Sequence, residues 1–123
     1  MLGGLLKALF GGGAAPDNAA GNAGVRAQLA AMGDDGTIPR HVLHYVYPNK
    51  KHDSAPREDI AAFLAGFDFD VVRDAEQDGG FVMEQNREVA SAEFDAFTGH
   101  LTDTLRDMGW DYDGWECAVA TEE

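Results

Sequence analysis

Four histidines are the side chains of this chain best suited to metal or acid–base chemistry. His41 and His44 are three residues apart, so a strand through them would send the two imidazoles to opposite faces, where they cannot share a metal ion. His52 and His100 fall in a predicted loop and a predicted helix. We expect each histidine to be a surface or hydrogen-bonded residue, and we expect no metal site and no cofactor.

The single cysteine, Cys117, alternates with Trp115 and Val119 in the last apolar run of the chain. Residues two apart share one face of a strand, which indicates a buried thiol. Without an adjacent base, such a thiol is a poor nucleophile. One cysteine also excludes an internal disulfide and a cysteine-based zinc cluster, which suits a reducing compartment.

Two acidic motifs have the composition of weak cation sites. The stretch DYDGWE, residues 111–116, resembles the start of a calcium loop but lacks the distal glutamate that completes one. Asp34 and Asp35 lie in the turn GDDG, where such residues more often serve as N-caps or turn residues. No glycine-rich phosphate loop is present. The residue types therefore give no positive indication of an enzyme.

The charge of the chain restricts its partners. Nine basic and 22 acidic residues give a formal net charge of -13. This charge disfavours nucleic acid and anionic membranes and favours a basic protein surface, although solubility explains it equally well. The first ten residues include Lys7 among their leucines and make a poor signal peptide, and no apolar run approaches a membrane span of roughly 20 residues. We expect a cytoplasmic protein.

The first 24 residues are predicted to be a leader outside the main domain. Residues 11–24 are rich in Gly and Ala, which is typical of a flexible linker. The apolar residues before them share one side of a helical wheel and predict a short amphipathic helix that could dock elsewhere, fold back or remain a tail. These apolar residues are Leu2, Leu5, Leu6, Leu9 and Phe10.

Residues 25–123 are predicted to form one domain with four strands. β-branched, aromatic or alternating residues indicate the strands, which cover residues 40–47, 67–72, 81–89 and 112–119. The two middle strands are expected to pair as a hairpin. In the last strand, Trp115 is expected in the core and Gly114 at a bend or bulge.

Apolar residues spaced three and four apart predict two helices between these strands. The first helix is capped by Asp53 or Ser54, has Pro56 in its first turn, and presents the stripe Ile60, Phe63, Leu64 and Phe67. The second begins at the cap Ser91, ends at Gly109, and presents the stripe Phe94, Phe97, Leu101, Leu105 and Met108. A short helix is also expected over residues 25–32.

The resulting order is strand, helix, strand, strand, helix, strand. This is the pattern of an α+β, ferredoxin-like βαββαβ fold, with a four-stranded antiparallel sheet and two helices on one face. The other face of the sheet would then be open, and we expect Asp68, Asp70, Glu84 and Glu116 to lie on it.

Two stretches resemble the RraB family of regulators of ribonuclease E activity. They are GDDGTIPRHVLHYVYP, residues 33–48, and DYDGWECAV, residues 111–119, and the order of the elements between them is similar too. The resemblance implies a non-catalytic ferredoxin-like regulator that binds ribonuclease E through protein contacts and lowers its activity on RNA. It also places Asp34, Asp35 and Gly36 on one family motif and Tyr112 to Trp115 on the other.

We therefore expect a binding module whose acidic residues contact a basic protein, without direct contact to nucleic acid or membrane. Two alternatives stay open: a small metal-dependent or hydrolytic enzyme with converging side chains, and a domain that self-associates through strand edges or the leader, as a homo-oligomer. The candidate partner-binding residues are Asp34, Asp35, Asp68, Asp70, Glu84, Tyr112, Asp113 and Glu116.

Overall fold

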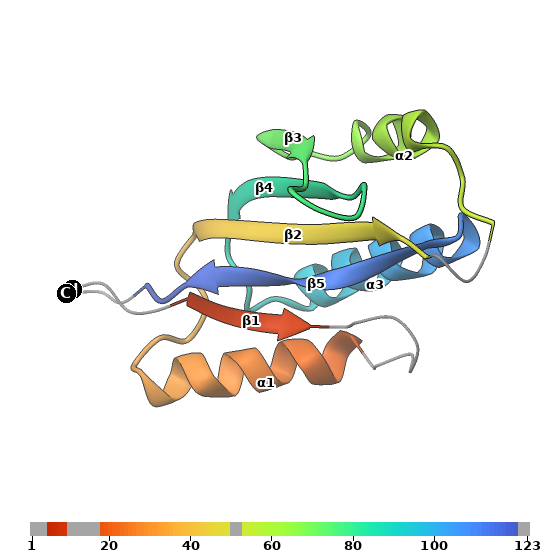
Figure 1. Cartoon of the computed structure of the whole chain (residues 1–123). Helices are drawn as coiled ribbons and strands as arrows, with labels where there is room; N and C mark the ends of the chain where they lie inside the picture. The colour runs from red at the N-terminus through yellow and green to blue at the C-terminus, as the bar shows by residue number, and fades with distance from the viewer. Residues whose placement is uncertain (1–4, 10–17, 50–52, 121–123) are drawn as a thin grey trace.

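The computed structural model describes residues 5–9, 18–49 and 53–120 of the 123-residue chain. In chain order the elements are β1 (Leu5–Leu9), α1 (Asn18–Ala31), β2 (Arg40–Pro48), α2 (Arg57–Leu64), β3 (Val71–Asp74), β4 (Phe81–Arg87), α3 (Ala92–Asp107) and β5 (Trp110–Ala118). The strands form one antiparallel sheet in the order β1-β5-β2-β4-β3 (Figure 1). From β2 to β5 this is the predicted α+β, ferredoxin-like arrangement.

The sheet contains one strand more than the sequence predicts. Leu5–Leu9 pairs antiparallel with β5, with Leu5 opposite Ala118 and Leu9 opposite Gly114. The helix predicted for the leader is therefore wrong over residues 5–9. A helix this short is marginal in water, whereas a strand here gains hydrogen bonds along the edge of β5. The predicted stripe residues Leu2 and Phe10 lie outside the described residues.

Helix α1 begins earlier than predicted and crosses the expected boundary between residues 24 and 25. Residues 18–24, which read as linker, are helical, while residues 11–17 lie outside the described part of the chain. Asn22 accounts for part of this difference, because its buried side chain bonds to Thr98 of α3 and Trp115 of β5. Such tertiary contacts override the weak helix propensity of Gly-rich sequence.

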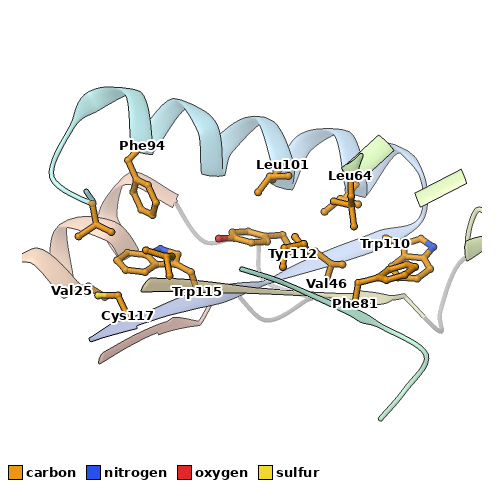
Figure 2. Packing of buried hydrophobic residues seen from close by; sticks show 14 of the residues in the cluster. Val25, Val46, Leu64, Phe81, Phe94, Leu101, Trp110, Tyr112, Trp115 and Cys117 are labelled. Atoms are coloured by element: carbon orange, nitrogen blue, oxygen red, sulfur yellow. The ribbon is translucent and has the colours of Figure 1, made fainter. Parts of the chain in front are cut away.

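All three helices pack on one face of the sheet and share one core. Figure 2 shows the labelled core side chains lying between α3 and the strands. Helix α1 joins the two predicted helices on this face through Val25 and Leu29. The fully buried members from α2 and α3 are Ile60, Leu64, Phe94, Leu101 and Leu105.

The strand predicted over residues 67–72 begins only at Val71. The ring centroids of Phe67 and Phe69 lie 5.5 and 5.9 Å from that of Phe97 on α3. These two residues alternate as strand residues do, but they hold a loop against α3. Asp68 and Asp70 are exposed in this loop and are not strand residues, so the predicted strand alternation that put them on the open face does not apply to them. The predicted hairpin itself is confirmed, because β3 pairs antiparallel with β4.

The predicted ends of α3 are confirmed, and the predicted start of α2 is not. The Ser91 hydroxyl accepts a hydrogen bond from the Phe94 N–H at 3.0 Å, and Gly109 follows the helix with φ 76°. Helix α2 has Pro56 as its N-cap and no side-chain cap. Ser54 does not cap it, since its hydroxyl donates to the Asn49 carbonyl. None of the described helices is long and apolar enough to span a membrane.

Candidate functional site

The face of the sheet opposite the core, here called the open face, carries the alternate side chains of β2. Val42, His44 and Val46 are buried on the helix side, so Leu43 and Tyr45 project to the open face. None of the described helices covers this face (Figure 1). Leu43 lies at its centre.

The register places Leu43 opposite Glu84 on β4 and opposite Glu116 on β5. Two of the predicted site residues therefore share one row of the open face, as expected. Their role in binding remains a prediction.

Glu84 is held in a small ion network on this face. Its two carboxylate oxygens accept hydrogen bonds from Arg73 Nε at 2.8 Å and His41 Nε2 at 2.7 Å. The Arg73 guanidinium and, after it, His41 lower the pKa of the Glu84 carboxyl. Glu84 is thus an ionised group whose charge is already compensated.

Glu116 is covered by Tyr45. The Tyr45 hydroxyl donates to Glu116 Oε1, and Glu116 is only 6% exposed. Burial, reinforced by the adjacent carboxylate, raises the pKa of Tyr45 well above its usual range. A partner would meet the Tyr45 ring before it met this carboxylate. The two carboxylates at the centre of the open face are therefore already bonded to neighbouring side chains, and they are less accessible to a partner than the sequence predicts.

A groove of about 370 Å³ lies on the open face beside the β3–β4 hairpin. Tyr45, Tyr47, Arg73 and Val82 line it from the strands, and residues 75–78 line it from the hairpin turn. Burial, followed by the nearby Asp113 and Asp78 carboxylates, raises the pKa of Tyr47. Asp113, a predicted site residue, thus lies close to the groove.

The turn GDDG places Asp34 inside the protein. The Asp34 side chain is fully buried and forms a bidentate ion pair with Arg40, which also donates to the Ala118 carbonyl. The N–H groups of Gly36 and Ala120 donate to the same carboxylate at 2.9 and 2.8 Å. Burial opposes ionisation of Asp34, but these donors outweigh it and lower the carboxyl pKa to about 2.

The neighbouring Asp35 is exposed and accepts hydrogen bonds from the Thr37 N–H and hydroxyl. The predicted turn role of both aspartates is therefore confirmed. In this conformation the buried Asp34 is not available to a partner.

A family model described as RraB, regulator of ribonuclease activity B, matches residues 20–117. This protein belongs to the RraB family. The match covers the first stretch that carries the resemblance and the second as far as residue 117. It makes the chain a member of a family of ribonuclease regulators, which act on a protein partner. A comparison with curated proteins and a comparison with solved structures each gave no match.

The second RraB motif, YDGW, also lies largely inside. Gly114 has φ 121° at the register shift between β2 and β5, which confirms the predicted bulge. Trp115 is fully buried and its Nε1–H donates to Asn22 Oδ1 at 2.7 Å, which confirms its predicted core position. Tyr112, predicted as a contact residue, is only 2% exposed and cannot reach a partner from this position.

His44 forms a buried network that the sequence analysis did not identify. Its Nε2 lies 2.8 Å from Gln85 Oε1 and its Nδ1 lies 2.7 Å from the Tyr112 hydroxyl. Because the Gln85 oxygen only accepts, Nε2 carries the proton and Nδ1 accepts from Tyr112. Burial lowers the His44 pKa to about 4. The signal was present, since His44 stands between Val42 and Val46 at the strand period of two.

The reactive side chains of the described residues do not converge on an accessible site. His44 is fully buried, and Cys117 is 1% exposed with a pKa raised by burial, as predicted for an inert thiol. Among residues 5–9, 18–49 and 53–120, no three His, Cys, Asp or Glu side chains are placed to hold a metal ion.

Proposed function

We propose that this RraB-family protein binds ribonuclease E, or a related RNA-degrading enzyme, through its open face and lowers RNA cleavage without catalysing a reaction itself. The observation that carries the proposal is a sheet face with no described helix over it and with partly exposed Leu43, Tyr45 and Tyr47. Tyrosines are enriched at protein interfaces because they combine a large apolar ring with a polar tip. The cytoplasm, where such an enzyme meets RNA, is the expected compartment.

The charge of the chain supports a partner with a basic surface. At a formal net charge of -13, the protein attracts basic segments over long range and repels RNA. Exposed carboxylates such as Asp35 steer the encounter, while the tyrosine rings supply contact area. Raising the salt concentration from 50 to 200 mM is therefore expected to weaken the complex several-fold.

The test uses purified full-length ribonuclease E, a labelled RNA substrate, and increasing amounts of this protein. Wild-type protein is expected to slow cleavage and to bind the enzyme in calorimetry without consuming RNA. Leu43→Arg places a cation in the middle of the open face and is expected to raise the Kd tenfold or more, which corresponds to about 1.4 kcal/mol.

The matched control is Ala96→Arg, which adds the same side chain to the exposed side of α3. This variant is expected to inhibit as the wild type does. Equal losses in both variants would show that the open face is not the contact surface. Unchanged RNA cleavage at saturating wild-type protein would reject the inhibitory function.

A further inference from the structure

The described sheet ends in two edge strands, β1 and β3. Strand β1 lies beside α1, whereas β3 forms the opposite edge of the sheet (Figure 1). All four residues of β3 are exposed, and among the described strands only β4 pairs with it. An edge strand can accept a further strand through the N–H and C=O groups that point away from the sheet.

Two residues of β3 direct their backbone groups outward. The Ala75 N–H donates to the Gly80 carbonyl at 2.9 Å, and the β3–β4 register continues from this bond along β3. Successive peptide groups along a strand face opposite edges, so the N–H and C=O groups of Val72 and Asp74 face away from β4. A strand added outside β3 can therefore pair with these groups and leave the hydrogen bonds of the hairpin intact.

The two valines of β3 make the edge apolar on both faces of the sheet. Val71 is 41% exposed and lies opposite Glu84, on the open face. Val72 is 39% exposed and lies opposite Met83, on the helix face. Edge strands that stay in water usually carry charges at such positions. An added strand would remove apolar surface from water on both faces.

The two charged residues of β3 are bonded within the chain. Arg73 Nε donates to Glu84 at 2.8 Å, and Asp74 accepts a hydrogen bond from Arg57 of α2 at 2.6 Å. Both bonds run toward the body of the protein, because Glu84 lies on β4 and Arg57 stacks on the Phe81 ring of the same strand. Charges that normally keep another strand away from an edge are thus held on the inner side of β3.

Acidic residues flank β3 at both ends. Asp68 and Asp70 precede the strand and Glu76 follows it, and all three are exposed. These carboxylates favour lysine or arginine in an added strand, and the formal net charge of -13 acts in the same direction. A second copy of this chain is disfavoured as the source of that strand, because it would bring the same net charge and the same acidic flanks to the edge.

We propose that β3 accepts an extended, basic segment of the protein partner as a further strand of the sheet. Main-chain hydrogen bonds to Val72 and Asp74 hold the segment, its apolar side chains cover the two valines, and its lysines or arginines face the acidic flanks. The edge adjoins the open face through Val71, so one partner can contact both surfaces. The identity of that partner rests on the proposed function above, but the ability of the edge to bind such a segment does not.

The direct test is an NMR titration of the full-length protein with acetyl-Lys-Val-Arg-Val-Lys-Val-Arg-amide. The amide signals of residues 71–74 are expected to shift with a Kd of about 0.1–1 mM. The same peptide with methylated backbone nitrogens keeps its charge but cannot donate main-chain hydrogen bonds, and it is expected to bind at least tenfold more weakly. The peptide with glutamate in place of its lysines and arginines is expected to leave these signals in place.

The variant for this test is Val72→Pro, which removes an outward N–H from the edge. Proline is tolerated in an edge strand where its nitrogen faces away from the sheet, so the hairpin is expected to stay intact. Val72→Thr is the matched control, because it keeps the N–H and the β-branched shape. The proline variant is expected to lose at least tenfold in affinity for the basic peptide, and the threonine variant less than threefold.

The acidic flank is tested by Asp68→Asn with Asp70→Asn, which is expected to lose at least threefold in affinity for the basic peptide. The control, Asp103→Asn with Asp107→Asn, makes the same change in charge on the exposed side of α3 and is expected to bind as the wild type does. Equal affinity in these two variants would overturn the selection of a basic segment.

Equal binding of the plain and the N-methylated peptide, or of Val72→Pro and Val72→Thr, would overturn the edge site. The comparison of the two peptides uses the wild-type protein, so it decides the question even where the proline variant does not fold. A dimer in light scattering that Val72→Pro converts to monomer would assign the edge to a second copy of the chain and overturn the partner strand.

The ribonuclease assay separates the failure of this inference from that of the proposed function. If Val72→Pro inhibits ribonuclease E with the same Kd as the wild type, the partner does not use the edge and the proposed function stands. If the basic peptide binds the edge but the wild type does not inhibit the enzyme, the edge site stands and the proposed function fails.

Discussion

Replacing Asp34 by Ala is expected to destabilise the fold strongly, although this residue stands in a family motif and is acidic. The substitution leaves the Arg40 guanidinium, which is 2% exposed, without its carboxylate, and leaves two backbone N–H groups without an acceptor. Breaking one partner of a buried ion pair costs about 3–5 kcal/mol. Domains of this kind have a free energy of unfolding of about 5–15 kcal/mol, so the loss is a large fraction of the total.

The neighbouring Asp35 offers a matched control. Its carboxylate is exposed and accepts hydrogen bonds from Thr37 within the turn, so Asp35→Ala is expected to cost far less stability than Asp34→Ala. Urea unfolding gives the free energy of unfolding of both variants, and thermal melts give their Tm, each followed by circular dichroism. For a chain of this size the Asp34 variant is expected to lose about 12–20 °C in Tm, and the Asp35 variant only a few degrees.

A double variant tests whether the loss of stability in Asp34→Ala comes from the broken ion pair with Arg40. In Asp34→Leu with Arg40→Met both charges are absent, so the double variant is expected to be more stable than Asp34→Ala by about 2 kcal/mol or more. A loss below about 1 kcal/mol for Asp34→Ala would refute the structural role assigned to this carboxylate. So would a double variant no more stable than the single one.

Three further perturbations test the interior of the fold. The His44 pKa is about 4 in the folded protein and about 6.5 in the unfolded chain. The free energy of unfolding is therefore expected to fall by up to about 3 kcal/mol as the pH drops from 6.5 to 4. In His44→Phe, urea midpoints should not show this pH-dependent loss. Gly114→Ala should cost about 1–3 kcal/mol, since φ is 121° there, whereas Gly99→Ala inside α3 should stabilise by about 0.5–1 kcal/mol in thermal melts. Trp115→Phe should cost about 2–4 kcal/mol in urea unfolding, because it leaves the Asn22 side-chain carbonyl without its donor and opens a void. The Kd for ribonuclease E is expected to stay unchanged in this variant.

Sequence patterns predicted those parts of the fold that local chemistry determines. The stripe of α3, its Ser91 cap and the Gly109 stop are all observed, because spacing and capping act within one element. The run of β-branched and aromatic residues identified β2 within one residue of its observed end. The order of these elements then predicted the ferredoxin-like topology.

The errors arose where distant contacts decide the structure. Strand β1 exists because β5 offers an edge, and nothing within residues 5–9 predicts that partner. The loop anchors Phe67 and Phe69 alternate as a strand does, but α3 supplies the surface that holds them. Burial of Asp34 depends on Arg40 and on Ala120 at the far end of the chain. Each of these is a pairing across the sequence, which composition and period do not contain.

The same reasoning separates the site residues that could be predicted from those that could not. Alternation placed Glu84 and Glu116 on the open face correctly, but only the structure shows that Arg73 and Tyr45 occupy their carboxylates. Glu76 and Asp78, whose carboxylates line the groove, belong to no sequence motif, and the sequence predicted only that their segment connects two strands of a hairpin. A groove is a property of neighbouring strands, so it appears only once the register is known.

The location of the two RraB motifs bears on how partner recognition should be sought. Asp34, Tyr112 and Trp115 are all buried, and Gly114 is required by its backbone conformation. These four residues of the motifs therefore specify the interior and the bulge of the sheet rather than a contact surface. Residues that recognise a partner are therefore expected among the side chains that are at least partly exposed, such as Leu43, Tyr45 and Tyr47 on the open face, and not among the buried ones. Variants of these exposed side chains, and not variants of the buried motif residues, are consequently expected to change binding while leaving the protein folded.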